Sequence, residues 1–119
     1  MKHTDKITTQ YPDQNLLRSF LDNDPSQKIY PVTGMSIGSL KCEDFYKEFF
    51  VEKDIEVVDM ECSAFFSAAN YIQKKAVALL YVTDIIDKKL FFEPLGPQDK
   101  LQIDKAIQTA CKAIQVFCK

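Results

Sequence analysis

The stretch from Val57 to Asp84 limits the possible folds more than any other part of this sequence, because two different periodicities follow each other within it. Val57 and Val58 are β-branched and apolar, which predicts a strand. From Glu61 to about Gln73, apolar residues recur at three- and four-residue steps and predict a helix. The continuous apolar run from Ala76 to Val82 has the length of a second strand. The stretch therefore reads as a β-α-β unit.

Acidic residues stand at both turning points of this unit. Asp59 and Glu61 follow the first strand, and Asp84 follows the second. In an open parallel sheet, the carboxyl ends of the strands face the ligand crevice. We therefore expect Asp59, Glu61 and Asp84 to lie on the same rim of the sheet.

The remaining segments continue the alternation of helices and strands. Residues 1–12 are polar and predict a loosely held lead-in, and residues 13–119 predict a single α/β domain whose short, mainly parallel sheet is flanked by helices. Gly34 and Gly38 would allow tight approaches of the backbone. The expected segments are a short helix capped by Asp13 and ended by Asn23–Ser26, a strand from Lys28 to about Gly38, a partly helical segment Glu43–Phe50, an irregular loop after Asp84 and a helix from about Gln98 to Phe117.

Composition excludes several classes of protein. A hydrophobic content of 46% with 27% charged residues is typical of a folded globular domain. The net charge of −2 gives no basic field for a nucleic acid, and no apolar run is long enough to span a bilayer. We expect a cytoplasmic protein with reduced thiols and no metal, because Cys42, Cys62, Cys111 and Cys118 lack the close spacing of a zinc site.

Two motifs at a fixed separation carry a resemblance. The run from Asp59 to Ala64, followed by Val82-Thr83-Asp84, resembles the C-terminal half of the nucleoside phosphorylase and nucleosidase superfamily. This superfamily includes purine nucleoside phosphorylase, uridine phosphorylase and methylthioadenosine/S-adenosylhomocysteine nucleosidase. The segment from Val32 to Tyr46 is similar to the upstream strand and aromatic segment of the family, so the resemblance covers most of residues 10–119. It implies half of the three-layer phosphorylase-like fold.

The resemblance also implies roles for individual residues. Glu61 would accept hydrogen bonds from the ribose 2′- and 3′-hydroxyls, a task that suits a carboxylate with two acceptor oxygens. Asp84 would be the catalytic residue at purine N7, where it donates a proton or a hydrogen bond while the glycosidic bond breaks. The other implied substrate-binding residues are Met60 against the sugar, Phe45 stacked on the base, Thr83 as the hydroxyl that orients Asp84, and Asp59 on the same rim.

Each of these residues also has a purely structural interpretation. Glu61 would favour the dipole at the start of a helix, Met60 and Phe45 would fill a core, and Asp84 would cap a turn. Position alone favours the structural interpretation, and the matched spacing of the two motifs favours the functional one.

The main departure from the family pattern is the absence of the N-terminal half. The N-terminal half of full-length members supplies the phosphate loop and the phosphate-binding arginines or, in nucleosidases, the acid that activates water. This sequence lacks that half, and its single arginine is Arg18. We therefore expect no cofactor, phosphate as a possible co-substrate, and no cleavage by the isolated chain. The expected partners are a purine nucleoside and either further copies of the chain or a complementary N-terminal half. The alternatives are a non-catalytic oligomeric nucleoside-binding or interaction module, and a small α/β domain without a recognisable site.

Overall fold

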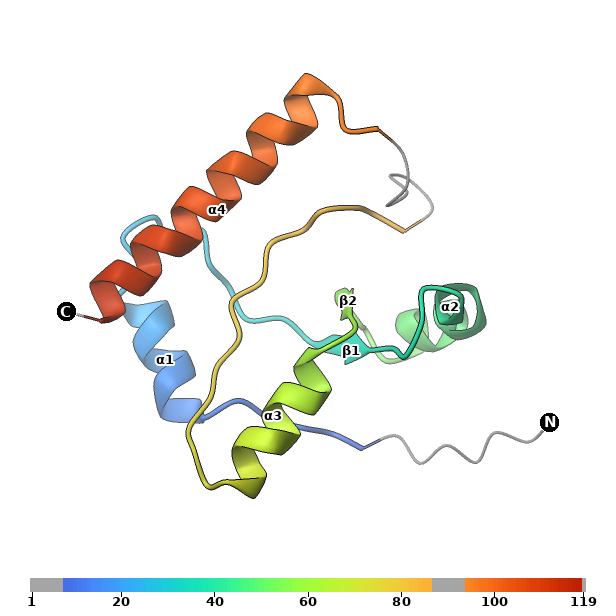
Figure 1. Cartoon of the computed structure of the whole chain (residues 1–119), viewed down its shortest axis with the longest axis horizontal. Coiled ribbons are helices and arrows are strands. Elements are labelled where there is room, and N and C mark those ends of the chain that lie inside the picture. The colour runs from blue at the N-terminus through green and yellow to red at the C-terminus, as the bar shows by residue number, and fades with distance from the viewer. Residues whose placement is uncertain (1–7, 87–93, 119) are drawn as a thin grey trace.

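The computed structural model describes residues 8–86 and 94–118. Figure 1 shows helices arranged around a small central sheet, with the longest helix forming one side of the molecule. The elements in chain order are α1 (Gln14–Asp22), β1 (Gly34–Ser36), α2 (Cys42–Glu52), β2 (Val57–Asp59), α3 (Cys62–Tyr71) and α4 (Pro97–Phe117). The described chain is therefore a mixed helical structure with a short parallel sheet, broadly of the α/β class.

The first helix begins and ends where the sequence predicts. The Asp13 carboxylate accepts a hydrogen bond from the Leu16 N–H at 2.9 Å, which satisfies one of the free donors of the first turn. Beyond the helix, Asp24 is buried and organises a turn, because its carboxylate accepts hydrogen bonds from the backbone of Ser26 and Ile29. The chain is thereby turned toward the sheet.

The sheet consists of β1 and β2, which pair in parallel with Gly34 opposite Val57 and Ser36 opposite Asp59. A β-carbon at Gly34 would meet the Val57 side chain at 3.0 Å, so the close approach expected at this glycine is present. Gly38 has open space around it instead.

The strand expected from Lys28 to Gly38 is much shorter than predicted, since β1 covers only Gly34–Ser36. The N–H groups of Lys28 and Ile29 are bonded to Ser26 and Asp24, and Pro31 has no N–H to offer. Pairing starts only at Thr33, whose carbonyl accepts a hydrogen bond from Glu56.

Helices α2 and α3 confirm the expected helical segments, with α3 ending two residues before the predicted Gln73. Both helices close with the same C-terminal motif. Asp54 and Gln73 have positive φ angles of 53° and 57°, and the next residues donate back into the helix, Ile55 to Phe50 and Lys74 to Ala69. This is the Schellman arrangement, which normally places glycine at the positive-φ position.

The second strand of the predicted β-α-β unit is absent. Residues 76–82 run across the molecule between α3 and α4 without forming a helix or strand (Figure 1). The Schellman turn at Gln73 directs the chain toward the start of α1, where the Ala76 carbonyl accepts a hydrogen bond from the Asp13 N–H at 2.8 Å. The apolar run has the propensity of a strand, but neither of the two described strands lies beside it to form a ladder.

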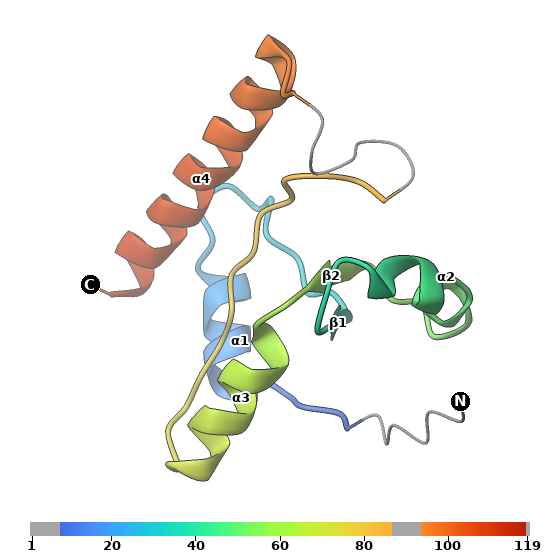
Figure 2. The same ribbon diagram turned by 45° about the vertical axis from the view of Figure 1, so that its right-hand side comes forward.

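The long C-terminal helix confirms its predicted position. Figure 2 shows the C-terminal end of α4 near one end of α1. The rings of Phe20 and Phe117 join the two helices and stack with centroids 4.3 Å apart. The predicted apolar face of α4 is covered only in part, since Ala113 is buried while Ile107 and Ile114 are exposed. Most of the loop expected after Asp84 lies at residues 87–93, outside the described part of the chain. None of the described helices has the length and apolarity needed to cross a membrane.

Candidate functional site

The turn between β2 and α3 is held by the side chain of Asp59. One of its oxygens, Oδ1, accepts hydrogen bonds from the Ser36 hydroxyl at 2.7 Å, the Cys62 N–H at 2.8 Å and the Glu61 N–H at 2.9 Å. The Ser36 hydroxyl in turn accepts a hydrogen bond from the Ser63 N–H at 2.8 Å. Together these contacts satisfy the first N–H groups of α3. In this structure Asp59 therefore joins the sheet to the helix, which is a different task from the substrate contact that the resemblance implied.

The electrostatics of the turn follow from these contacts. Burial works to raise the pKa of Asp59, but the hydrogen bonds from Ser36, Cys62 and Glu61 outweigh it and hold the pKa below its ordinary value. Burial raises the pKa of the neighbouring Cys62 thiol to about 11, and the negative charges of Asp59 and Glu61 act in the same direction. The turn therefore keeps a carboxylate ionised and a thiol protonated at neutral pH.

Met60 and Glu61 are presented outward by this turn. The Met60 residue is 46% exposed, and Glu61 is exposed as well. One Glu61 oxygen, Oε2, accepts a hydrogen bond from the Met60 N–H at 3.3 Å, a long contact that leaves acceptor capacity on the carboxylate. A thioether and a carboxylate thus stand side by side at the carboxyl end of a parallel strand.

Thr83 and Asp84 lie on the segment that follows residue 76. The Thr83 hydroxyl donates a hydrogen bond to Asp84 Oδ1 at 2.7 Å, so the two residues that the resemblance paired are in contact. Because this segment is not a strand, Asp84 does not stand at the carboxyl end of one, and the common rim expected with Asp59 and Glu61 is not formed. Among the described residues, no hydrogen bond or ion pair joins Asp84 to Glu61.

Phe45 lies in the first half of α2 and is 67% exposed. Its ring meets the ring of Tyr46 edge-on, with centroids 4.9 Å apart. The exposed part of an aromatic ring in this setting can accept a flat heterocycle.

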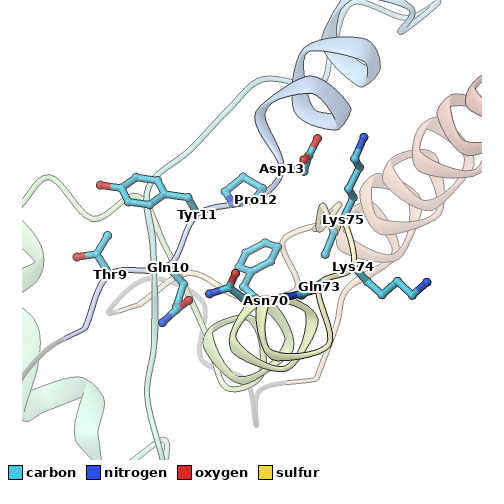
Figure 3. Close-up of a pocket in the computed structure, with 11 residues that line it drawn as sticks. Thr9, Gln10, Tyr11, Pro12, Asp13, Asn70, Gln73, Lys74 and Lys75 are labelled. Carbon is cyan, nitrogen blue, oxygen red and sulfur yellow. The ribbon is translucent and has the colours of Figure 1, made fainter.

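Sequence reasoning missed a polar hollow of about 510 Å³ between the lead-in and the end of α3. Figure 3 shows Asn70, Gln73 and the two lysines Lys74 and Lys75 on its α3 side, facing the segment from Thr9 to Asp13. None of the six predicted site residues lines it. The hollow has no sequence signature, because it is made by a helix end and a segment about sixty positions away that carry no motif together.

The part of the chain that the structure describes contains no cluster of potential metal ligands. No group of three or more His, Cys, Asp or Glu side chains is placed to hold an ion there. The four cysteines are free thiols.

Comparison with protein-family models, with curated protein sequences and with solved structures found no significant match to this chain.

Proposed function

We propose that this chain is a nucleoside phosphorylase-like protein that binds purine nucleosides through their ribose at the turn between β2 and α3. The observation that supports the proposal is the exposed pair Met60 and Glu61, held outward because Asp59 fixes the turn beneath it. A carboxylate with free acceptor capacity suits the two adjacent hydroxyls of a ribose, and the Met60 thioether suits the apolar side of the sugar ring.

The remaining site residues complete the proposal. Phe45 offers an exposed ring for the purine, and Asp84, oriented by Thr83, acts at purine N7. Inorganic phosphate is the proposed co-substrate when cleavage occurs. The corresponding fold is half of the three-layer phosphorylase architecture, with β1, β2 and α3 as its central unit.

Cleavage requires more than the isolated chain provides. Asp84 stands on a segment that is not paired with β2, so the sheet does not hold the residue proposed at N7 in register with the residue proposed at the ribose. This separation favours a nucleoside-binding module over a complete enzyme for the chain on its own. We expect the purified chain to release no base from inosine, adenosine or methylthioadenosine, with or without phosphate.

The direct test measures nucleoside affinity by isothermal titration calorimetry. Glu61→Gln removes the charge from two hydrogen bonds, so it should weaken inosine binding roughly tenfold. The matched control is Glu48→Gln, which changes an exposed glutamate on α2 and should leave the affinity unchanged.

A second comparison isolates the ribose contact. The parent chain should bind inosine more tightly than 2′-deoxyinosine, and Glu61→Gln should reduce this preference, because the carboxylate that reads the 2′-hydroxyl is weakened. Equal inosine affinity in the parent and in Glu61→Gln would refute the assignment of Glu61. Base release by the parent that disappears in Asp84→Asn would show instead that the chain assembles a complete site.

A further inference from the structure

The segment 77–83 is a chain of strand-forming residues without a partner. It carries the apolar sequence Val-Ala-Leu-Leu-Tyr-Val before Thr83, and no backbone hydrogen bond joins residues 77–83 to any other described residue. Leu80, Tyr81 and Val82 are 48%, 47% and 59% exposed. Extended apolar backbone with free N–H and C=O groups is a template for pairing with another strand.

One edge of the chain is in use directly before this segment. The Ala76 carbonyl accepts the hydrogen bond from the Asp13 N–H. Along an extended chain, the backbone groups of successive residues point to opposite edges. The groups of the odd-numbered residues Val77, Leu79 and Tyr81 therefore point to the edge away from Asp13.

The charges at the two ends of the segment are opposite. Lys74 precedes it and Asp84 ends it, and neither forms an ion pair with any other described residue. A segment that is positive at one end and negative at the other complements a copy of itself only in the antiparallel orientation.

We propose that two copies of this chain associate through antiparallel pairing of segment 77–83, with Leu79 opposite Leu79 of the second copy and Lys74 opposite Asp84 of the second copy. The open edge requires odd-numbered residues to pair with odd-numbered residues, and the charges at the two ends then select Leu79 as the centre. Pairing about Leu79 uses the backbone groups of the odd-numbered residues, which are those on the open edge. The same register aligns each lysine with an aspartate.

This association goes beyond the proposed function and does not depend on it. It would hold Asp84 against a lysine of the second copy and away from a purine, which agrees with the absence of base release expected for the isolated chain. Association is measured without nucleoside, so its failure leaves the Glu61 test untouched.

The first experiment is charge reversal, read by sedimentation velocity over a range of protein concentrations. Lys74→Glu and Asp84→Lys should each raise the dimer dissociation constant roughly tenfold, because two symmetry-related pairs become repulsive. The double variant should restore the dimer. Lys75→Glu is the matched control, because Lys75 would lie opposite the uncharged Thr83 in this register. The double variant Lys75→Glu with Asp84→Lys should therefore not restore association.

The second experiment tests the backbone edge. Leu79→Pro removes an N–H on the open edge and should abolish the dimer, whereas Leu80→Pro removes an N–H on the opposite edge and should preserve most of it. A parent chain that stays monomeric at every concentration, or charge reversals whose effects do not cancel in the double variant, would overturn the proposal.

Discussion

The sharpest structural test of the central unit is the replacement of Asp59, because a single carboxylate oxygen serves both the sheet and α3. Asp59→Ala removes the hydrogen bonds to Ser36, Glu61 and Cys62. Losing the helix cap costs about 1 kcal/mol, and leaving partly buried donors without an acceptor costs about 1 to 2 kcal/mol more. We therefore expect the free energy of unfolding to fall by about 2 to 3 kcal/mol.

The assay is urea unfolding followed by circular dichroism at neutral pH. Asp59→Asn keeps one acceptor oxygen without the charge and should lose about 1 kcal/mol, and Asp84→Ala, which gives up only its contact with Thr83, should change stability by less than about 0.5 kcal/mol. If Asp59→Ala and Asp84→Ala were equally stable, the proposed link between sheet and helix would be wrong.

The pH dependence of stability provides a second readout of the same carboxylate. The pKa of Asp59 is lower in the folded chain than in the unfolded chain, so its contribution is complete above an ordinary aspartate pKa of about 3.9. The contribution is lost as the pH falls further, toward the folded pKa. The parent should therefore lose more stability than Asp59→Asn between pH 5 and the acid limit of about pH 2.

The other predictions concern the thiol beside Asp59 and the two Schellman turns. Cys62, whose pKa is raised to about 11, should react with iodoacetamide at neutral pH more slowly than the exposed Cys111 and Cys118, as followed by mass spectrometry of the peptides. Equal rates at all three thiols would contradict the partly buried, acid-flanked environment of Cys62. Replacing Gln73 by glycine should stabilise the fold by about 1 kcal/mol, because glycine adopts the positive φ angle without strain, and Asp54→Gly should gain less because aspartate tolerates this conformation better than glutamine. Lys53→Gly, one position earlier with φ −101°, is the matched control and should not stabilise, so a gain at Lys53 as large as at Gln73 would rule out the backbone explanation.

The sequence predicts helices well here because their signals are local. The Asp13 cap and the α4 periodicity each lie within the element that they define, and the structure confirms both. The strand expected at 76–82 is wrong because a strand also needs a neighbour, and an apolar run does not specify one.

The roles of the site residues also depend on contacts with residues that are distant in the sequence. Asp59 stands at the position that predicted a ligand contact, but its partner Ser36 comes from another strand, 23 positions away, and only pairing of β1 with β2 brings them together. The exposure of Met60 and Glu61 then follows from a turn that combines the local contacts of Asp59 to Glu61 and Cys62 with its contact to Ser36 on the other strand.

The hydrogen bond between Asp13 and Ala76 has a consequence for the size of any assembly. A strand with both edges open can add copies without limit and grow into a fibre, whereas a strand with one edge occupied pairs once and stops. Figures 1 and 2 both place α1, which starts directly after Asp13, beside the segment that follows Ala76. Under the proposed pairing, the start of α1 lies along the edge that a third copy would need, so the association ends at two copies.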